Sequence, residues 1–337
     1  MQERVDPRAV KRRLDASLHQ PCGSLSGFWP PRQASSKRID PVTLRLFVAV
    51  LDTGAIATAA SRENIAPSAV SKRLSDLEDN LGARLLQRSN RGIEPTAAGR
   101  ELLNLARGVL NDLDNIYWQI KDHSTGPSGL VRVFANISAI TEFLPGPLRS
   151  FSAKYPNIQI ELQEKISEVV LKGVAANAAD VGLYVPGRSV PPGVYSIPYK
   201  WDELVLAAPI DHPLACVDRA TIAETLDYDY VGLHTGSAIN QQLLRAARDA
   251  DKPLRCRVQV TSFDALSLMI AAGMGIGVMP RMIGEQFARL DRLRISNLDE
   301  DWAHREFHIC TRSSEGLSVA ARLFFDHLQS DAACAHH

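Results

Sequence analysis

Basic and hydroxyl side chains gather in one short stretch of the chain, between residues 67 and 91. Guanidinium, ammonium and hydroxyl groups are the donors with which proteins contact the phosphates and base edges of nucleic acids. On the exposed face of a predicted helix these residues are Ser68, Ser71, Lys72 and Ser75, with Arg73 on the flank of the helix and Pro67, also a candidate, at its start. In the turn that follows they are Arg84, Arg88, Asn90 and Arg91, with no acidic residue between 84 and 91. A DNA contact and a solvated basic turn are the two interpretations of this second set.

Hydroxyl and amide residues at the ends of predicted strands form another group of candidates. Each set follows a strand and opens a helix, whose N-terminal N–H groups suit a bound anion. The sets are Asn136, Ser138, Ala139 and Thr141, then Thr235, Gly236 and Ser237, and finally Thr261, Ser262 and Phe263. The alternative for each set is simple capping of the helix that it precedes.

Cysteine and histidine spacing does not indicate a metal or disulfide site. The five cysteines are odd in number and widely spaced, and none forms a Cys-x-x-Cys pair. His304 and His308 stand four apart, but in a predicted strand, and no His-Glu-x-x-His occurs. We expect reduced cysteines and no metal, although a redox-sensing cysteine pair is the alternative.

Motifs for several enzyme classes are missing. The glycines of Gly273-Met-Gly-Ile-Gly277 follow a predicted helix and precede a strand, which is the reverse of a dinucleotide fingerprint. Neither Gly-x-Ser-x-Gly nor Gly-Lys-Ser/Thr occurs. We therefore expect no catalytic residues and no cofactor.

The composition is that of an ordinary globular protein with more than one folding unit. The chain has 337 residues, 45% hydrophobic and 23% charged. It has no apolar run of about 18 residues and no secretory signal, so we expect a cytoplasmic protein without membrane contact. The net charge is zero, but residues 1–37 carry +4, residues 38–121 carry +1 and residues 122–337 carry −5. The whole-chain charge therefore says little about a nucleic-acid partner.

Three short helices must position the first group of candidates. Asp40-Pro41 opens a helix with apolar residues at Leu44, Phe47, Val48 and Leu51, and Gly54 ends it. An Ala-rich helix covers about 57–63, and Pro67 opens a third, which Gly82 closes. The tight turn between the last two predicts a helix-turn-helix, and the basic turn after Gly82 predicts a β-hairpin wing.

A long helix follows, which Thr96 caps. Its apolar residues alternate in steps of three and four, as in a coiled-coil seam: Leu102, Leu105, Val109, Leu113, Ile116 and Ile120. A second copy of the helix is the simplest partner for this stripe, and packing on its own domain is the alternative. Before the helices, residues 1–38 have no apolar periodicity and predict a disordered basic extension. Either a start codon placed too far upstream or a functional basic arm would account for it.

Strands and helices alternate from residue 130 onward. Strands are expected near 130–135, 158–162, 180–184, 204–207, 230–233, 257–260, 276–279 and 306–311, with helices that include 144–154, 237–250 and 263–272. This alternation predicts an α/β fold with a largely parallel sheet. The length suffices for two small lobes with a cleft between them.

The chain resembles the LysR-type transcriptional regulators over about residues 39–330. In the helix-turn-helix region the resemblance rests on Leu46-Phe-Val-Ala-Val50, Thr58-Ala-Ala60, residues 68–78, Leu81–Arg88 and Thr96-Ala-Ala-Gly99. In the α/β region it rests on Phe143-Leu-Pro145, Tyr155-Pro-Asn-Ile158 and residues 273–280. One departure concerns the recognition helix, where Ala66, Pro67 and Ser68 replace the family's Ser, Gln and Pro. Alanine cannot cap with its side chain, at a loss of about 1 kcal/mol.

The resemblance implies an organisation in four parts. These are the extension 1–38, a winged helix-turn-helix at 39–96 (helix-turn-helix about 56–75), a linker and dimerisation helix at 97–125, and an effector-binding domain at 128–330. The last part has the two-lobed fold of periplasmic binding proteins, with lobe 1 at about 128–200 and 303–330 and lobe 2 at about 201–302.

The resemblance also implies a function and partners. The expected partners are double-stranded promoter DNA, a small-molecule effector such as a small carboxylate, and further copies of the chain in a homodimer and homotetramer. The effector would shift the lobes and thereby alter DNA binding and bending. The rival hypothesis is a solute-binding module or an enzyme built on the α/β part.

Overall fold

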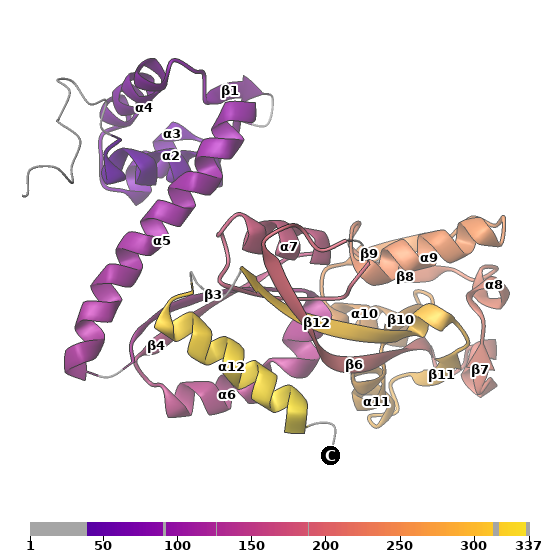
Figure 1. Ribbon diagram of the computed structural model, residues 1–337. Helices are drawn as coiled ribbons and strands as arrows, with labels where there is room; N and C mark the ends of the chain where they lie inside the picture. Colours follow the sequence, from indigo (N-terminus) through magenta and orange to yellow (C-terminus); the bar gives the residue numbers. More distant parts are fainter. Residues whose placement is uncertain (1–38, 90–91, 126, 188, 313–316, 335–337) are drawn as a thin grey trace, which may run out of the picture. The chain divides into compact units, whose positions relative to one another are not determined.

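The computed structural model describes residues 39–89, 92–125, 127–187, 189–312 and 317–334 (Figure 1). The predicted disordered extension, residues 1–38, lies outside these described residues. No helix within the described ranges combines the length and apolar character that crossing a bilayer demands.

The first three helices enclose one small apolar core. They are α2 (Pro41–Thr53), α3 (Ile56–Arg62) and α4 (Pro67–Leu81). Their inward residues include Phe47, Val70 and Leu74, which are almost completely buried. As the sequence predicts, α4 begins at Pro67 without a side-chain cap from Ala66, and Gly82 ends it with φ +67°.

A two-stranded wing follows α4. Strands β1 (Leu86–Ser89) and β2 (Gly92–Pro95) pair antiparallel, which confirms the predicted hairpin. Glu78 holds the entry to this wing, because its Oε1 accepts hydrogen bonds from the backbone N–H of Leu85 (2.7 Å) and Leu86 (3.1 Å). The N–H of Ile93 also donates to the Gly54 carbonyl at 2.8 Å, which ties the hairpin to the end of α2.

Helix α5 (Ala97–Thr125) is 29 residues long. The Thr96 hydroxyl accepts a hydrogen bond from the Gly99 N–H at 3.0 Å, which confirms the predicted cap. Beyond the wing the predicted apolar stripe is exposed in the single chain: Leu105 is 62% exposed, Ile116 58% and Ile120 69%. Such a row of exposed apolar side chains is costly in water unless something covers it.

The remainder of the chain is α/β. Its strands are β3 (Gly129–Ala135), β4 (Ile158–Glu164), β5 (Val181–Tyr184), β6 (Val194–Ala208), β7 (Arg219–Ala220), β8 (Tyr230–Leu233), β9 (Cys256–Val260), β10 (Gly277–Pro280), β11 (Arg294–Leu298) and β12 (His304–Arg312). Its helices are η1 (Ala139–Phe143), α6 (Pro145–Lys154), α7 (Ser167–Ala175), η2 (Pro213–Cys216), α8 (Ile222–Thr225), α9 (Ala238–Asp249), α10 (Phe263–Ala271), α11 (Arg281–Ala288), η3 (Asp301–Ala303) and α12 (Val319–Cys334).

The main sheet is mixed, so the prediction of a largely parallel sheet is wrong. Its order is β4-β3-β5-β12-β6-β11-β7, with β10 also on β6, while β8 and β9 pair separately. Strand β3 is parallel to β4 and β5, but β12 and β6 run antiparallel to all their neighbours in the sheet. Residues 303–330 were expected in lobe 1, but the alternation of strands and helices did not indicate that β12 lies antiparallel between β5 and β6.

Strand β6 passes through both lobes. Its first residues pair with β12 in lobe 1, and residues 204–208 pair with β10 and β11 in lobe 2. The sequence indicated only 204–207, because Pro198 and the polar run after Tyr199 interrupt the apolar pattern. Pro198 is tolerated because it lies at a register shift between Phe307 and His308 of β12, where the regular ladder is broken.

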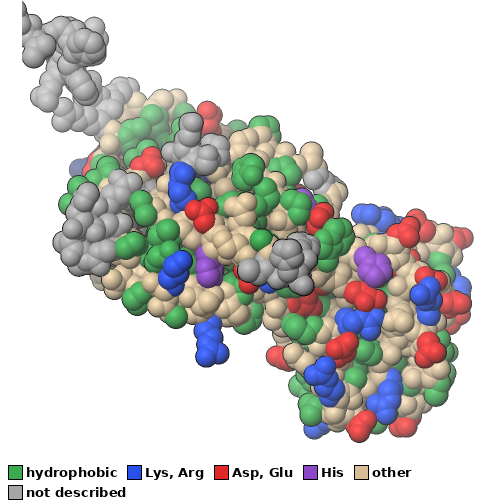
Figure 2. All heavy atoms as spheres, turned by 60° about the horizontal axis from the view of Figure 1, so that its bottom comes forward, with side chains coloured by type: hydrophobic (Ala, Val, Ile, Leu, Met, Phe, Trp, Pro, Cys, Tyr) green, Lys and Arg blue, Asp and Glu red, His purple; other side chains and the backbone are tan. Residues whose placement is uncertain are grey.

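Each lobe has its own core. Lobe 1 buries residues such as Phe151, Tyr199 and Phe324, and the rings of Phe151 on α6 and Phe324 on α12 lie 5.0 Å apart. Lobe 2 buries a separate cluster from β6, β8, α9, α10 and β10. On the face shown in Figure 2, Lys, Arg, Asp and Glu side chains are interspersed over lobe 2, at the right of the view. Surface charge of mixed sign favours solubility rather than attraction of DNA phosphates.

The contact between α5 and the wing gives a prediction about helix glycines. A Cβ on Gly99 would stand 2.0 Å from the Leu85 carbonyl oxygen, whereas the nearest atom to one on Gly108 would be 3.8 Å away. We expect Gly99→Ala to lower the free energy of unfolding by about 1–3 kcal/mol, because the overlap outweighs the gain from replacing a helical glycine. We expect Gly108→Ala, the matched control, to raise it by up to about 1 kcal/mol. Urea unfolding of both variants measures this, and equal effects of the two would contradict the packing described.

Candidate functional site

Helix α4 presents a polar face to solvent. Pro67, Ser68, Ser71, Lys72 and Ser75 are exposed, while Val70, Leu74 and Leu77 on the opposite face are buried. The helix therefore offers hydroxyl and ammonium groups along one side at helical spacing. A helix with this arrangement, preceded by a tight turn, has the dimensions that the DNA major groove admits.

Two of the predicted basic residues already have partners within the chain. Arg73 donates from Nη1 to the Thr43 hydroxyl at 3.2 Å, which links α4 to α2. Arg84 lies 2.9 Å from Glu78 Oε2, although its side chain is 85% exposed. Arg88 is exposed on β1. Asn90 and Arg91, also predicted to bind DNA, lie outside the described residues.

Glu78 is a structural carboxylate rather than a DNA contact. Burial alone would raise the pKa of Glu78, but two backbone N–H donors and Arg84 outweigh it, so the pKa lies below its usual range. The ionised form is therefore the one that fastens the wing to α4.

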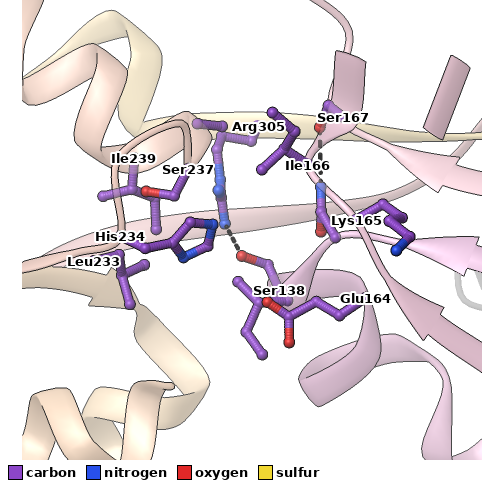
Figure 3. Close-up of a pocket in the computed structure, with 13 residues that line it drawn as sticks. Ser138, Glu164, Lys165, Ile166, Ser167, Leu233, His234, Ser237, Ile239 and Arg305 are labelled. Atoms are coloured by element: carbon purple, nitrogen blue, oxygen red, sulfur yellow. Dashed lines mark hydrogen bonds between the residues drawn. The ribbon is translucent and has the colours of Figure 1, made fainter. Parts of the chain in front are cut away.

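A narrow cavity lies between the two lobes (Figure 3). From lobe 1 it is lined by residues 136–138 after β3, by Glu164 at the end of β4 with residues 165–167 after it, and by Arg305 of β12. From lobe 2 it is lined by Leu233 and His234 at the end of β8 and by residues 237–239 at the start of α9. The ends of several strands and the starts of helices thus meet in one place.

Helix starts at this cavity are held by side-chain caps. The Asn136 Oδ1 accepts from the Ala139 N–H at 2.9 Å, and the Asn136 amide donates to the Ser167 hydroxyl at 3.3 Å. On lobe 2, the Ser237 hydroxyl accepts from the Asn240 N–H at 3.2 Å. These bonds satisfy one backbone donor at each turn and fix the polar side chains in place.

Arg305 is the buried basic residue of the cavity lining, which also includes Lys165. It is 7% exposed and forms a two-pronged ion pair with Asp202 of β6, in which Nε lies 2.8 Å from Oδ1 and Nη2 bonds Oδ2. The same Nη2 donates to the Ser138 hydroxyl at 3.2 Å, so the guanidinium reaches the cavity wall (Figure 3). Asp202 therefore sets the direction of Arg305.

Two polar atoms near this pair are buried without a hydrogen-bond partner in the described part of the chain. One is His234 Nδ1, and the His234 ring points toward Arg305 and Ser138 in Figure 3. The other is Glu142 Oε1. Burial raises the pKa of Glu142 to about 8, and the Asp202 carboxylate adds to this while Arg305 opposes it. At neutral pH Glu142 is mainly protonated, so the charged residues at the cavity are Arg305, which is paired with Asp202, and Glu164 and Lys165 of the lining.

The structure brings three of the predicted effector residues to this cavity: Asn136, Ser138 and Ser237. Ala139 is fully buried behind them, Thr141 donates to the Ile137 carbonyl at 2.8 Å, and Gly236 lies beside Ile166. Thr235 is exposed and contacts Gln259 at 3.4 Å. None of these four lines the cavity.

The third predicted turn, Thr261, Ser262 and Phe263, does not line this cavity either. Ser262 caps α10 by accepting from the Ala265 N–H at 3.2 Å, and Phe263 is buried in the core of lobe 2. Here the capping interpretation describes the observed contact.

Sequence reasoning missed Ser167, His234 and Arg305. Ser167 and His234 each follow a strand closely, so the signal used for the other sets could have found them. Arg305 stands about 170 residues from Asn136, and nothing local in the sequence indicates that β12 carries it to the cavity.

Comparison with known families now identifies the chain's relatives. The family described as the LysR substrate binding domain matches residues 124–333, and the bacterial regulatory helix-turn-helix of the lysR family matches residues 42–100. The chain belongs to the LysR family of transcriptional regulators. It is a DNA-binding regulator with an effector-binding domain, as the resemblance implied.

Individual relatives of this LysR regulator are distant but span nearly its whole length. It is 27% identical over 299 residues to the RuBisCO operon transcriptional regulator of Allochromatium vinosum, covering 87% of this chain and 96% of that protein. It is 24% identical over 293 residues to the transcriptional activator IlvY of Haemophilus influenzae, covering 85% and 98%. The crystal structure of CbnR, a LysR family regulator, shares the fold with a TM-score of 0.61 at 20% identity, covering 87% of this chain and 99% of that one.

Glu142 gives a prediction about the pH dependence of stability. Its pKa of about 8 in the folded chain lies above the ordinary 4.5, so its stabilising contribution is full below about 4.5 and is lost as pH rises to about 8. We expect the melting temperature to fall less steeply between pH 5 and pH 8.5 in Glu142→Gln than in the wild type. Glu168→Gln, which changes an exposed carboxylate of the same lobe, is the matched control. If the melting temperatures of wild type and Glu142→Gln changed equally with pH, Glu142 would not titrate in this range.

Proposed function

We propose that this LysR regulator binds a specific sequence of double-stranded promoter DNA through α4 and the wing. The exposed Ser68, Ser71, Lys72 and Ser75 would enter the major groove, and Arg88 with Arg91 would contact phosphates or the minor groove. Support comes from the exposure of these α4 side chains over a buried apolar face. The structural relative CbnR has been solved in complex with its target DNA.

The exposed stripe of α5 supports a homodimer. Leu105, Val109, Leu113, Ile116 and Ile120 lie at coiled-coil spacing and are 42–69% exposed in the single chain. A second α5 would cover them and place two α4 helices on one DNA. Pairing of dimers through the regulatory domains would then give a homotetramer.

We propose further that a small anion bound between the lobes is the effector. The observation that carries this is the convergence of Ser138, Ser237 and Arg305 beside the unpartnered His234 Nδ1. A carboxylate there would accept hydrogen bonds from hydroxyl and guanidinium donors and meet the N-terminal ends of two helices. A structural relative, the effector binding domain of QuiR, has been solved in complex with shikimate.

The proposed mechanism is a change in the arrangement of the lobes. An effector that contacts both walls of the cavity binds one arrangement better than another and shifts the population toward it. In a dimer or tetramer, that shift would change the spacing of the DNA-binding domains and the bend of the promoter.

The rival function is a solute-binding module or an enzyme on the α/β part. Family membership and the absence of nucleophile and phosphate-loop motifs from the sequence favour a regulator that is not an enzyme and that acts in the cytoplasm, where promoter DNA is found. A gel shift with the intergenic DNA beside the chain's own gene discriminates between the two. The regulator forms a specific complex that survives competitor DNA; absence of such a complex would favour the rival.

The wing gives a prediction about DNA affinity. We expect Arg88→Ala to weaken binding to specific and unrelated DNA alike, and to reduce the slope of log affinity against log salt by about 1, because one phosphate contact is lost. Gln87→Ala, which changes the neighbouring exposed residue of β1, should leave both quantities unchanged. Fluorescence anisotropy at several salt concentrations measures them. A salt slope that Arg88→Ala leaves intact would remove Arg88 from the DNA contact.

The cavity gives a prediction about ligand-induced stability. In a thermal-shift screen of small carboxylic acids against the full chain, a true ligand at about 100 times its Kd should raise stability by about 2.7 kcal/mol. Ser138→Ala should weaken the response, because a buried donor and acceptor at the cavity is removed. Ser150→Ala, which removes a lobe 1 hydroxyl outside the cavity, is the control. A stabilising acid whose effect Ser138→Ala leaves unchanged would place the anion elsewhere.

A further inference from the structure

The cavity beside Ser138 is small in this structure, with a volume of about 20 Å³. A cavity needs about 10–15 Å³ to hold one water molecule, so it accommodates a small polar group and little more. A second cavity of about 230 Å³ adjoins it, and Ala238, Ile239 and Arg305 line both. A ligand anchored in the first cavity therefore has room for its remaining atoms in the second.

Apolar side chains from both lobes line the second cavity. Val185 and Pro186 follow β5 in lobe 1, and Ile239 lies on α9 in lobe 2. Leu204 of β6 and Trp302 of η3 complete this lining. The Trp302 indole N–H donates to Glu300 Oε2 at 3.1 Å, so its polar atom is satisfied within the chain, and the partly buried ring lines the cavity as an apolar surface. A mainly apolar wall with few polar groups is typical of sites for small organic molecules.

Charges around the second cavity disfavour a second negative group on the ligand. Glu306 lines the cavity, and its Oε2 lies 3.2 Å from His308 Nε2. His304 and Arg305 also line this cavity, but the Arg305 guanidinium is directed to Asp202 and to Ser138 at the first cavity. A second carboxylate on the ligand would stand near Glu306, a group of like charge.

We propose that the effector is an organic acid with one carboxylate and an apolar body about the size of one ring. The carboxylate occupies the first cavity beside Ser138 and Arg305, and the body fills the second cavity against Trp302. A dry cavity of roughly 150 Å³ holds benzene, so the 230 Å³ present here has room for one substituted ring. This inference rests on the proposed anion site and adds the chemical class of its ligand.

The test is calorimetric titration of the full chain with three probes: acetate, cyclohexanecarboxylate and cyclohexane-1,4-dicarboxylate. We expect the ring monoacid to bind at least about tenfold more tightly than acetate, because its apolar surface leaves water, and more tightly than the diacid. Gln242 lines the second cavity from α9, so Gln242→Trp should fill the space and bring the ring acid to the level of acetate. Gln241→Trp, at the exposed neighbouring position that lines neither cavity, should change nothing.

Pro186→Phe fills the same space from lobe 1 and is the second variant, and unchanged acetate binding shows that each variant is folded. Equal affinity for acetate and the ring acid, or tight ring-acid binding in both filled variants, would overturn this inference and leave the anion site standing. A diacid that binds as tightly as the monoacid would also overturn it. A wild type that binds none of the three acids would instead refute the anion site, and with it the inference.

Discussion

The buried ion pair between Arg305 and Asp202 is the interaction on which the regulatory domain depends. Arg305 of β12 lies opposite Asp202 of β6 in the sheet, next to the point where β6 passes from lobe 1 into lobe 2. Both side chains are less than one-tenth exposed. Losing one partner of such a pair typically costs about 3–5 kcal/mol, because the other charge is left buried and unpaired. The pair therefore holds β12 and β6 together where β6 enters lobe 2. Through Nη2, it also directs the positive charge of Arg305 toward Ser138.

Local sequence patterns were sufficient for the elements of the DNA-binding part and for most strands of the two lobes, although β7 and β11 were not predicted. Helix α4 could be bounded by Pro67 and Gly82 because both residues act through their own backbone conformation. The stripe of α5 was visible because its periodicity is local. The pairing of the strands could not be predicted from local patterns, because contacts across more than 100 residues bring β12 between β5 and β6. Strand β6 was underestimated for a related reason: Pro198 and the polar residues near Asp202 are stabilised by tertiary partners.

The residues of the candidate cavity show the same difference between features with a local sequence signal and features set by long-range contacts. Asn136, Ser138 and Ser237 were predicted because a hydroxyl or amide at a strand-to-helix turn is a local signal. Ser262 carries the same signal yet caps α10 away from the cavity, so the signal does not by itself distinguish a cap from a ligand contact. Arg305 is the buried arginine of the cavity and has no local signal, because the sequence pattern of a buried arginine in a strand resembles that of an exposed one. Its burial and its pairing with Asp202 are properties of the fold alone.

In the proposed regulator, one domain that changes its arrangement connects the DNA-binding face to the anion site. Resonance energy transfer between dyes at the two ends of the intergenic DNA, bound by the full chain, measures this most directly. With a stabilising acid from the screen, we expect a changed end-to-end transfer in the wild-type complex and no change in the Ser138→Ala complex. Equal transfer with and without the acid in the wild type would contradict the link between cavity and DNA.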